Sequence, residues 1–439
     1  MAERKIVILG STGSIGRNAL DVVRASWESS PHGLRVVGLA AGSNARELAA
    51  QAREFCVRHV AIADERRADV LKAELAAGPV AQGPRIRGLR APRFRGGCEE
   101  REAIRHRSEH ADTISPPPSL SFRILTGTEG LCRLAALREA DLVLNAVVGA
   151  AGLRPTYAAL KAGKTVALAN KECLVMGGEL LTRLASGKPC CGGAMRGAAL
   201  IPVDSEHSAI YQILSRVRRD EVSRVILTAS GGPFYGLPKK ALSKVTPEEA
   251  LNHPRWKMGR KVSLDSATLM NKAFEVIEAR WLFALKPEQI QVLVHPQSVV
   301  HALVELNDGT LLAHLSKPDM RLPIQFALSY PQRLDAVIEH LDLTKVGELG
   351  FYAPDLDRFP ALELGYRAIS AGGSMGAVLN AANDVACEAF LAGRLAFPGI
   401  AETAARVMDR HRNHEIEGLD DIFEADRWAR EEARRCLGS

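Results

Sequence analysis

A short apolar strand pattern over residues 5–9 runs directly into Gly10-Ser11-Thr12-Gly13-Ser14-Ile15-Gly16, and a helix-periodic segment follows to about residue 25. Glycines at such a turn let the backbone approach a pyrophosphate, and the helix that begins there offers free N–H groups to the anion. The G-x-x-G-x-x-G spacing differs from the strict G-x-G-x-x-G fingerprint, so by itself the segment is compatible with a plain turn. Its position between a strand and a helix favours a dinucleotide-binding loop.

The end of the second strand pattern, residues 34–40, indicates which dinucleotide is bound. NAD-dependent enzymes carry an Asp or Glu there, which holds the ribose 2′-hydroxyl. Here the strand is followed by Ala41-Gly42-Ser43-Asn44-Ala45-Arg46, which has no carboxylate to repel a 2′-phosphate. Ser43, Asn44 and Arg46 can donate hydrogen bonds to such a phosphate, so the pattern favours NADPH.

Strand and helix patterns keep alternating through the first part of the chain, which is typical of a parallel sheet with crossover helices. From about residue 202 strands mix with long helices, and after about residue 356 only helices are expected. We therefore predict an α/β protein with an N-terminal Rossmann-like NADP-binding domain, a central α+β catalytic domain and a C-terminal α-helical bundle. The predicted boundaries are residues 1–203 for the NADPH-binding domain, 204–330 for the catalytic, metal-binding and dimerisation domain, 331–355 for a linker and 356–439 for the helices.

The expected elements can be given as residue ranges. The expected strands are residues 34–40, 59–63, 142–146, 165–169, 200–203, 224–228, 291–294 and 298–305. The expected helices are residues 15–25, 45–56, 153–162, 205–218, 267–284, 362–370, 375–392, 400–411 and 423–436.

Two stretches do not fit this alternation. Residues 78–121 are rich in Arg, Gly and Pro without periodicity, so a disordered insertion is the favoured interpretation. Cys98, His106 and His110 lie within it, but three scattered residues are a weak zinc pattern. Residues 186–197 are interpreted as a flexible surface loop.

Charge and cysteine content restrict the class of protein. The net charge of +6 is mild and scattered, so we expect no nucleic-acid partner. No apolar run reaches the roughly 18–20 residues of a membrane helix, so no membrane partner is expected. The eight cysteines form no C-x-x-C pair, and the first strand pattern begins close to Met1 without space for a targeting segment. These features favour a cytoplasmic protein with reduced thiols.

Three carboxylates are candidate metal ligands. Asp204 and Glu206 stand where the strand pattern of residues 200–203 turns into a helix, and Glu275 lies on the predicted helix 267–284. Hard carboxylate oxygens suit Mg²⁺ or Mn²⁺. Asp204 is equally well explained as a helix N-cap, and Glu275, with Asn271 and Glu278, as part of a solvated stripe. A buried Glu275 would need a partner, which favours a metal shared with the acidic pair.

Polar side chains follow other strands of the predicted sheets. Lys171 in Asn170-Lys171-Glu172 follows the strand at 165–169, where parallel sheets bind ligands, although it is also compatible with a surface lysine. Ser230 lies in Ser230-Gly231-Gly232 after another strand, an anion-friendly turn. Ser266, Asn271 and Lys272 supply further donors for a phosphate monoester, unless Ser266 merely caps the helix predicted to begin there.

A loop over residues 252–260 is polar and basic but carries Trp256 and Met258 at its centre. Bulky apolar residues in a loop suggest a lid that closes on a site, and a loop packed permanently on the core is the alternative.

Together these motifs resemble 1-deoxy-D-xylulose 5-phosphate reductoisomerases. The resemblance rests on the Gly10–Gly16 loop, Ala-Asn-Lys-Glu at 169–172, Pro-Val-Asp-Ser-Glu-His-Ser-Ala at 202–209, Ala-Ser-Gly-Gly-Pro-Phe at 229–234, His-Pro-x-Trp-x-Met-Gly at 253–259, Asp-Ser-Ala-Thr-Leu-Met-Asn-Lys at 265–272, His-Pro-Gln-Ser at 295–298 and Ala-Ala-Asn at 381–383. It implies NADPH- and divalent-metal-dependent (Mg²⁺, Mn²⁺ or Co²⁺) conversion of 1-deoxy-D-xylulose 5-phosphate to 2-C-methyl-D-erythritol 4-phosphate, in non-mevalonate isoprenoid biosynthesis, by a homodimer.

The resemblance also implies roles for individual residues. The implied metal ligands are Asp204, Glu206 and Glu275. The implied catalytic and substrate contacts are Lys171, Ser205, Glu206, Ser230, His253, Trp256, Ser266, Asn271, Lys272 and Glu275. The implied cofactor contacts are Thr12, Gly13, Ser14, Ile15, Gly42, Ser43, Asn44, Asn170, Glu172 and Gly259. His295 and His301 fall in the family's dimer-forming region, and Ser43 stands where the family often has Lys or Arg.

Two other classes of function are open at this point. One is a plain NADP dehydrogenase without a rearrangement, which would turn over without a metal. The other is a nucleotide sensor or RNA-binding protein that uses the Arg-rich stretch, which would bind RNA in a salt-dependent way.

Overall fold

The computed structural model describes residues 3–29, 33–77, 121–185, 198–256 and 258–438. The first part is a seven-stranded sheet in the order β4-β3-β2-β1-β5-β6-β7, in which all neighbouring strands are parallel. Its strands are β1 (Arg4–Leu9), β2 (Leu34–Ala41), β3 (His59–Ile62), β4 (Arg123–Thr126), β5 (Leu142–Asn145), β6 (Thr165–Leu168) and β7 (Ala199–Pro202). The expected parallel α/β sheet is confirmed, and the expected strands agree within one or two residues.

Helices cover this sheet because its strands are mostly apolar and buried beyond their first residues, and so they need cover on each face. The covering elements are α1 (Ser14–Ser29), α2 (Ala45–Glu54), η1 (Glu65–Arg67), α3 (Ala68–Ala77), α4 (Gly127–Ala135), η2 (Gly149–Gly152), α5 (Leu153–Lys161) and α6 (Glu172–Leu184). Ile6, Ile8 and Leu39 at the centre are fully buried. The strand order changes direction at β1, which lies between β2 and β5. Sheets of this kind bind ligands in a crevice at the point where the order changes.

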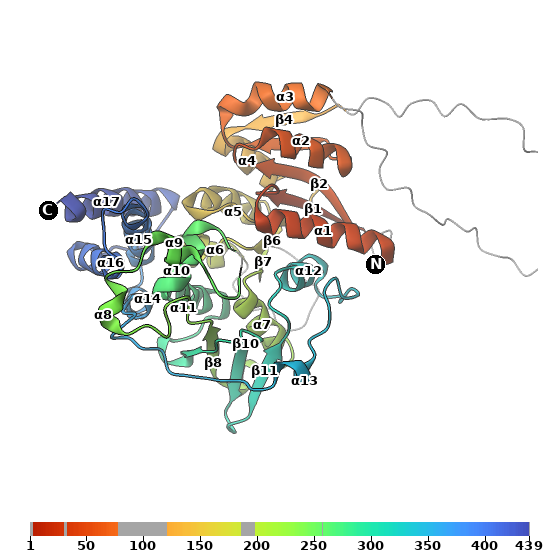
Figure 1. The fold of residues 1–439 in the computed structure, drawn as a ribbon. Coiled ribbons are helices and arrows are strands. Elements are labelled where there is room, and N and C mark those ends of the chain that lie inside the picture. The colour runs from red at the N-terminus through yellow and green to blue at the C-terminus, as the bar shows by residue number, and fades with distance from the viewer. Residues whose placement is uncertain (1–2, 30–32, 78–120, 186–197, 257, 439) are drawn as a thin grey trace, which may run out of the picture.

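A second, four-stranded sheet follows in the order β11-β10-β8-β9 and lies below the first in Figure 1. Strands β8 and β9 are parallel, and the β8–β10 and β10–β11 pairs are antiparallel. Its strands are β8 (Val222–Ala229), β9 (Ile290–Val294), β10 (Val300–Leu306) and β11 (Leu311–Leu315), of which β11 was not predicted. The accompanying helices are α7 (Ser205–Leu214), η3 (Arg219–Glu221), α8 (Lys239–Leu242), α9 (Pro247–Leu251), α10 (Arg260–Thr268), α11 (Met270–Phe283), η4 (Pro287–Gln289) and α12 (Arg321–Ser329).

The prediction of a single helix over residues 267–284 is wrong, because two helices meet within this range. Leu269 has a φ of +61°, so the chain turns there between α10 and α11. Ser266 therefore lies near the end of α10, and it does not cap a helix. The apolar periodicity continues across the break because Leu269 is itself buried, so the sequence pattern contains no signal for it. The predicted helix over 205–218 also ends early, at Leu214.

The last part is helical, as expected, and forms the blue group at the C-terminal end in Figure 1. Its elements are α14 (Ala361–Ala371), α15 (Met375–Leu391), α16 (Pro398–Arg410) and α17 (Leu419–Gly438). The short helix α13 (Leu343–Val346) precedes them within the predicted linker and is separate from this group in Figure 1. Helix α14 packs closely on α11, since a Cβ on Gly365 would lie 2.8 Å from the Ala273 Cα. Among the described residues no helix combines the length and apolarity that crossing a membrane requires. The predictions for residues 78–120 and 186–197 lie outside the described residues.

Candidate active site

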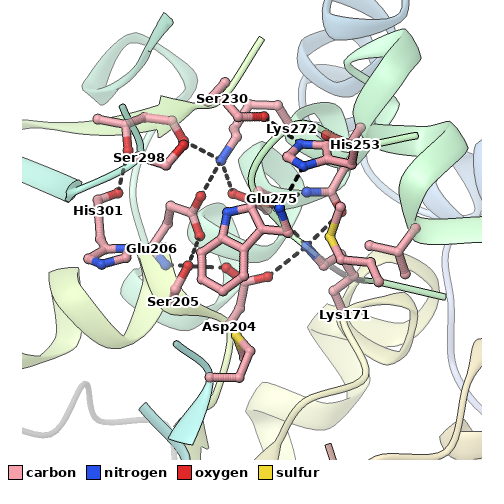
Figure 2. A pocket seen from close by; sticks show the side chains of 18 of the residues that line it. Lys171, Asp204, Ser205, Glu206, Ser230, His253, Lys272, Glu275, Ser298 and His301 are labelled. Atoms are coloured by element: carbon pink, nitrogen blue, oxygen red, sulfur yellow. Dashed lines mark hydrogen bonds and ion pairs between the residues drawn. The ribbon is translucent and has the colours of Figure 1, made fainter. Parts of the chain in front are cut away.

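A cavity of about 220 Å³ opens where the first sheet, the second sheet and the α10–α11 pair meet. Its wall includes Ser14 and Ile15 from the glycine-rich loop and the side chains that follow β6, β7 and β8. All eleven predicted metal, catalytic and substrate residues line it, namely Lys171, Asp204, Ser205, Glu206, Ser230, His253, Trp256, Ser266, Asn271, Lys272 and Glu275. Figure 2 shows most of them pointing toward one another from separate elements.

Two lysines hold the three carboxylates together. Lys171 Nζ lies 2.6 Å from Asp204 Oδ2 and 3.1 Å from Glu275 Oε1. Lys272 Nζ lies 2.9 Å from Glu206 Oε1 and 2.5 Å from Glu275 Oε2. Glu275, which is 1% exposed, therefore pairs with both lysines, and these ion pairs offset the free-energy cost of burying its charge.

Asp204 caps α7, as one of the two interpretations of the sequence predicted, and its second carboxylate oxygen is directed at the charged side chains of the cavity. Its Oδ1 accepts a hydrogen bond from Glu206 N at 3.3 Å, which caps α7, while Oδ2 faces Lys171. Burial by itself raises the pKa of Asp204, but the charges of Lys171 and His207 outweigh it and hold the pKa well below its usual range. Glu206 behaves in the opposite way, because burial and the neighbouring Glu275 raise its pKa to about 7.

His207 and Glu278 form a buried layer behind the carboxylates. His207 Nε2 donates to the Glu275 carbonyl oxygen at 2.9 Å, and Nδ1 lies 3.3 Å from Asp204 Oδ1 and 3.4 Å from Glu278 Oε2. Burial lowers the pKa of His207, but Glu278 and Asp204 raise it to a net value of about 9. Asp204, His207 and Glu275 offer ligand atoms within 4.8 Å of one another. Because both nitrogens of the protonated ring already face acceptors, we assign His207 to orienting Asp204 and not to binding a metal.

The residues fit a divalent cation. Among the described residues, four carboxylates (Asp204, Glu206, Glu275 and Glu278) adjoin three cationic side chains (Lys171, Lys272 and His207). Oxygens of three carboxylates face one cavity, which is the donor set that Mg²⁺ or Mn²⁺ prefers.

His253 and Ser230 form a hydrogen-bonded pair on the opposite wall. His253 Nδ1 accepts from Trp256 N at 2.9 Å, so the neutral ring carries its proton on Nε2, which donates to Ser230 Oγ at 2.8 Å. Burial lowers the pKa of His253, which favours this neutral form. Since Ser230 Oγ also accepts from Gly232 N at 3.2 Å, its own hydroxyl proton points elsewhere and can be donated to a ligand.

The predicted cofactor residues divide into three groups. Ser14, Ile15 and Gly259 line the cavity. Thr12 and Gly13 lie in the adjoining loop after β1, and Gly42, Ser43 and Asn44 are exposed at the end of β2, where Asn44 caps α2. Asn170 and Glu172 are buried and absent from the cavity wall. Asn170 donates to the Val147 and Gly149 carbonyl oxygens, so it holds the loop after β5.

Sequence reasoning missed several residues of the wall. Asn18, Thr228, Ser298, His301 and Met320 line the cavity without having been assigned to the site. Ser298 closes the His-Pro-Gln-Ser motif, and its φ of +54° marks a turn directed at the cavity, so that motif was the available signal. Figure 2 shows Ser298 and His301 on the side of Glu206.

Known proteins match the chain over almost its whole length. Sequence profiles match residues 6–84 and 101–178 (1-deoxy-D-xylulose 5-phosphate reductoisomerase), 200–283 (the C-terminal domain of that enzyme) and 315–432 (the DXP reductoisomerase C-terminal domain). The 1-deoxy-D-xylulose 5-phosphate reductoisomerase of Thermodesulfovibrio yellowstonii is 44% identical over 99% of this chain and 100% of its own. That of Symbiobacterium thermophilum is 48% identical over 98% of each chain.

Solved structures agree with these matches. The Zymomonas mobilis 1-deoxy-D-xylulose 5-phosphate reductoisomerase in complex with NADPH has a TM-score of 0.82, 37% identity and full coverage of both chains. A DOX-P reductoisomerase in complex with NADPH, fosmidomycin and magnesium has a TM-score of 0.81 and 36% identity over 99% of this chain and 98% of its own. With relatives this similar over the full length, the chain belongs to the 1-deoxy-D-xylulose 5-phosphate reductoisomerase family.

Proposed function

We propose that this protein rearranges and reduces 1-deoxy-D-xylulose 5-phosphate to 2-C-methyl-D-erythritol 4-phosphate with NADPH and a divalent metal, in isoprenoid precursor biosynthesis. One observation carries the proposal: three carboxylates suited to a metal and the dinucleotide loop line the same cavity. A plain dehydrogenase would not need the buried carboxylates. Burying these carboxylates together with two lysines costs free energy of folding, and groups of this kind cluster at functional sites.

Asp204, Glu206 and Glu275 would hold the metal. The chemistry that a bound divalent cation and NADPH supply there is polarisation of the substrate carbonyl and delivery of hydride to the rearranged aldehyde. Lys171 and Lys272 place two ammonium groups on the same wall, where they stabilise negative charge on substrate oxygens. His207 keeps Asp204 oriented from behind.

Ser230, Ser266, Asn271 and Lys272 would bind the phosphate of the substrate. Ser230 offers a free hydroxyl proton because its oxygen lone pairs accept from His253 and Gly232. Trp256 and Met258 line the cavity with His253 and would exclude water from the bound substrate. Ser205 donates to Glu206 Oε2 at 2.5 Å and lines the cavity, where it would contact the substrate. A phosphate held away from the reacting carbons orients them.

The cofactor would lie over the glycine-rich loop, with its pyrophosphate on Thr12, Gly13, Ser14 and Ile15, and with Gly259 on the far side. Gly42, Ser43 and Asn44 would face the 2′-phosphate. Arg46 supports the choice of NADPH, since its side chain is 87% exposed and its Nε lies 3.2 Å from Glu74 Oε1. Asn170 and Glu172 would act from beneath the cofactor site.

The domain boundaries stated above, a cytoplasmic location and a homodimer complete the proposal. Among the described residues, Cys132, Cys173 and Cys387 form no disulfide, which suits a reducing compartment. Leu311 and Leu315 are 52% and 37% exposed on the edge strand β11, which supports pairing of two chains at this edge.

The test is NADPH oxidation with 1-deoxy-D-xylulose 5-phosphate and Mg²⁺ or Mn²⁺, followed at the reduced-nicotinamide band. We expect metal-dependent turnover by the wild type and a loss of about 10³-fold or more in Glu275→Gln, because a buried charged ligand is removed. Mn²⁺ affinity measured by calorimetry should fall in the same variant.

Glu288→Gln is the matched control, since Glu288 is an exposed glutamate that does not line the cavity. It should keep both the turnover and the metal affinity. Turnover that survives EDTA and Glu275→Gln would contradict the metal site and favour a plain dehydrogenase.

A further inference from the structure

A buried carboxylate on α10 is held by the C-terminal helices. Asp265 is 3% exposed and precedes Ser266, which lines the cavity. Its Oδ1 accepts from Asn383 Nδ2 at 2.8 Å and from Cys387 Sγ at 3.7 Å, both on α15. Its Oδ2 lies 2.5 Å from Lys261 Nζ. Both carboxylate oxygens of Asp265 therefore have partners. Those of Oδ1 lie on α15, and that of Oδ2 lies on α10 itself.

The contacts continue outward from the cavity as a chain of ion pairs. Lys261 Nζ also lies 3.3 Å from Asp384 Oδ1 on α15. Asp384 Oδ2 lies 2.7 Å from Arg430 Nη2 on α17, and Arg430 Nε lies 2.8 Å from Asp426 Oδ2. Burial by itself lowers the pKa of Lys261, but Asp265 and the other acidic neighbours raise it above its ordinary value, so the lysine stays charged.

The helix that receives these contacts is set closely against the turn that carries Ser230. A Cβ on Gly232 would lie 2.8 Å from the Ser266 carbonyl oxygen and 3.0 Å from the Ala267 Cα. Helix α10 also begins directly after Gly259, where the loop carrying His253 and Trp256 ends. A shift of α10 therefore moves Ser266 and the end of this loop together.

We infer that Asp265, Asp384 and Arg430 are positioning residues, through which the C-terminal helices hold Ser266 at the distance from Ser230 that a phosphate monoester requires. The inference rests on the proposed function, because it deepens the phosphate site described above. None of the three residues lines the cavity, so each acts through α10.

The test uses Arg430→Gln and the isosteric Asp384→Asn. Arg430→Gln removes the ion pair farthest from the cavity, and Asp384→Asn removes the carboxylate that joins Lys261 to Arg430. We expect KM for 1-deoxy-D-xylulose 5-phosphate to rise about 5- to 10-fold, within the range for coupling through packed networks. KM for NADPH and kcat should change less than about twofold, because such a loss is mainly of uniform substrate binding. Arg430→Lys should recover most of the affinity.

Inorganic phosphate is the second probe, and its dissociation constant is obtained from the ³¹P line width during a titration. It should rise by a factor similar to that of the sugar-phosphate KM. This measurement needs no turnover, so it tests the positioning role independently of the proposed reaction. If the wild type does not convert the proposed substrate, only the proposed reaction is contradicted.

Arg410→Gln is the matched control, because Arg410 on α16 also pairs with an acid on α17, Glu432 at 2.6 Å, but has no link to α10. It should leave KM and phosphate affinity unchanged. Wild-type phosphate affinity in folded Asp384→Asn and Arg430→Gln, or an equal loss in Arg410→Gln, would overturn the inference.

Discussion

At the scale of single residues, the charge on His207 makes stability depend on pH. The folded pKa of about 9 lies above the unfolded value of roughly 6.5, so folding favours the protonated ring. This stabilisation is fully present below about pH 6.5 and is lost as the pH rises through about 9, and its size is on the order of 3 kcal/mol. We expect His207→Gln to lower the free energy of unfolding at pH 6 by about that amount and to approach the wild type near pH 9.5.

The measurement is urea unfolding across this pH range in EDTA, so that no metal competes for Asp204. His340→Gln serves as the control because His340 is exposed, and this variant should unfold like the wild type. If the difference in free energy of unfolding between the wild type and His207→Gln stays constant from pH 6 to pH 9.5, a protonated His207 is contradicted.

At the scale of elements, the turn between β8 and α8 depends on Gly232. Its φ is +67°, and a Cβ would crowd the α10 backbone at Ser266. Gly232→Ala should therefore lower the free energy of unfolding by about 2–4 kcal/mol through backbone strain and the forced shift of α10. KM for the sugar phosphate should rise as well, because Ser230 and Ser266 move apart.

Gly236→Ala offers a close comparison in the same segment, since nothing lies within 4 Å of a Cβ at that position. Thermal unfolding and steady-state kinetics on both variants separate the two cases. Equal melting temperatures and equal KM values for the two variants would show that the contact with α10 has no consequence.

At the scale of the whole molecule, the exposed edge of the second sheet is where we propose that two chains pair. Strand β11 alternates exposed and half-buried residues, with Leu311, Ala313 and Leu315 on the exposed side. Replacing Leu311 and Leu315 together by Lys should raise the dimer dissociation constant by roughly 100-fold or more, since charges would be buried without partners. Sedimentation velocity over a concentration series measures the effect.

Val70→Lys is the control on the opposite part of the fold, because Val70 is 41% exposed on α3. It should sediment like the wild type. A wild type that is monomeric at micromolar concentration, or a double variant that remains dimeric, would exclude β11 as the interface.

The sequence by itself determined the elements whose signals are local. The glycine-rich loop, the strand–helix alternation and the motif around Asp204 each lie within a few residues, because phosphate turns, parallel strands and helix caps are formed by neighbouring residues. The motifs in their order also predicted the family. They did not predict the break at Leu269, since buried apolar residues continue the same pattern across it. They did not predict β11 either, because its apolar residues Leu311, Ala313 and Leu315 lie on an exposed face and produce no alternation of apolar and polar residues.

Only the tertiary structure decided which charges meet. Lys171 reaches Glu275 across 104 residues of chain, and Asn383 reaches Asp265 across 118. It also placed Asn170 and Glu172 beneath the surface, and His207 with Glu278 behind the carboxylates. The physical reason is that a buried charge is tolerated only where packing supplies its partner, and that partner comes from whichever element the fold brings alongside.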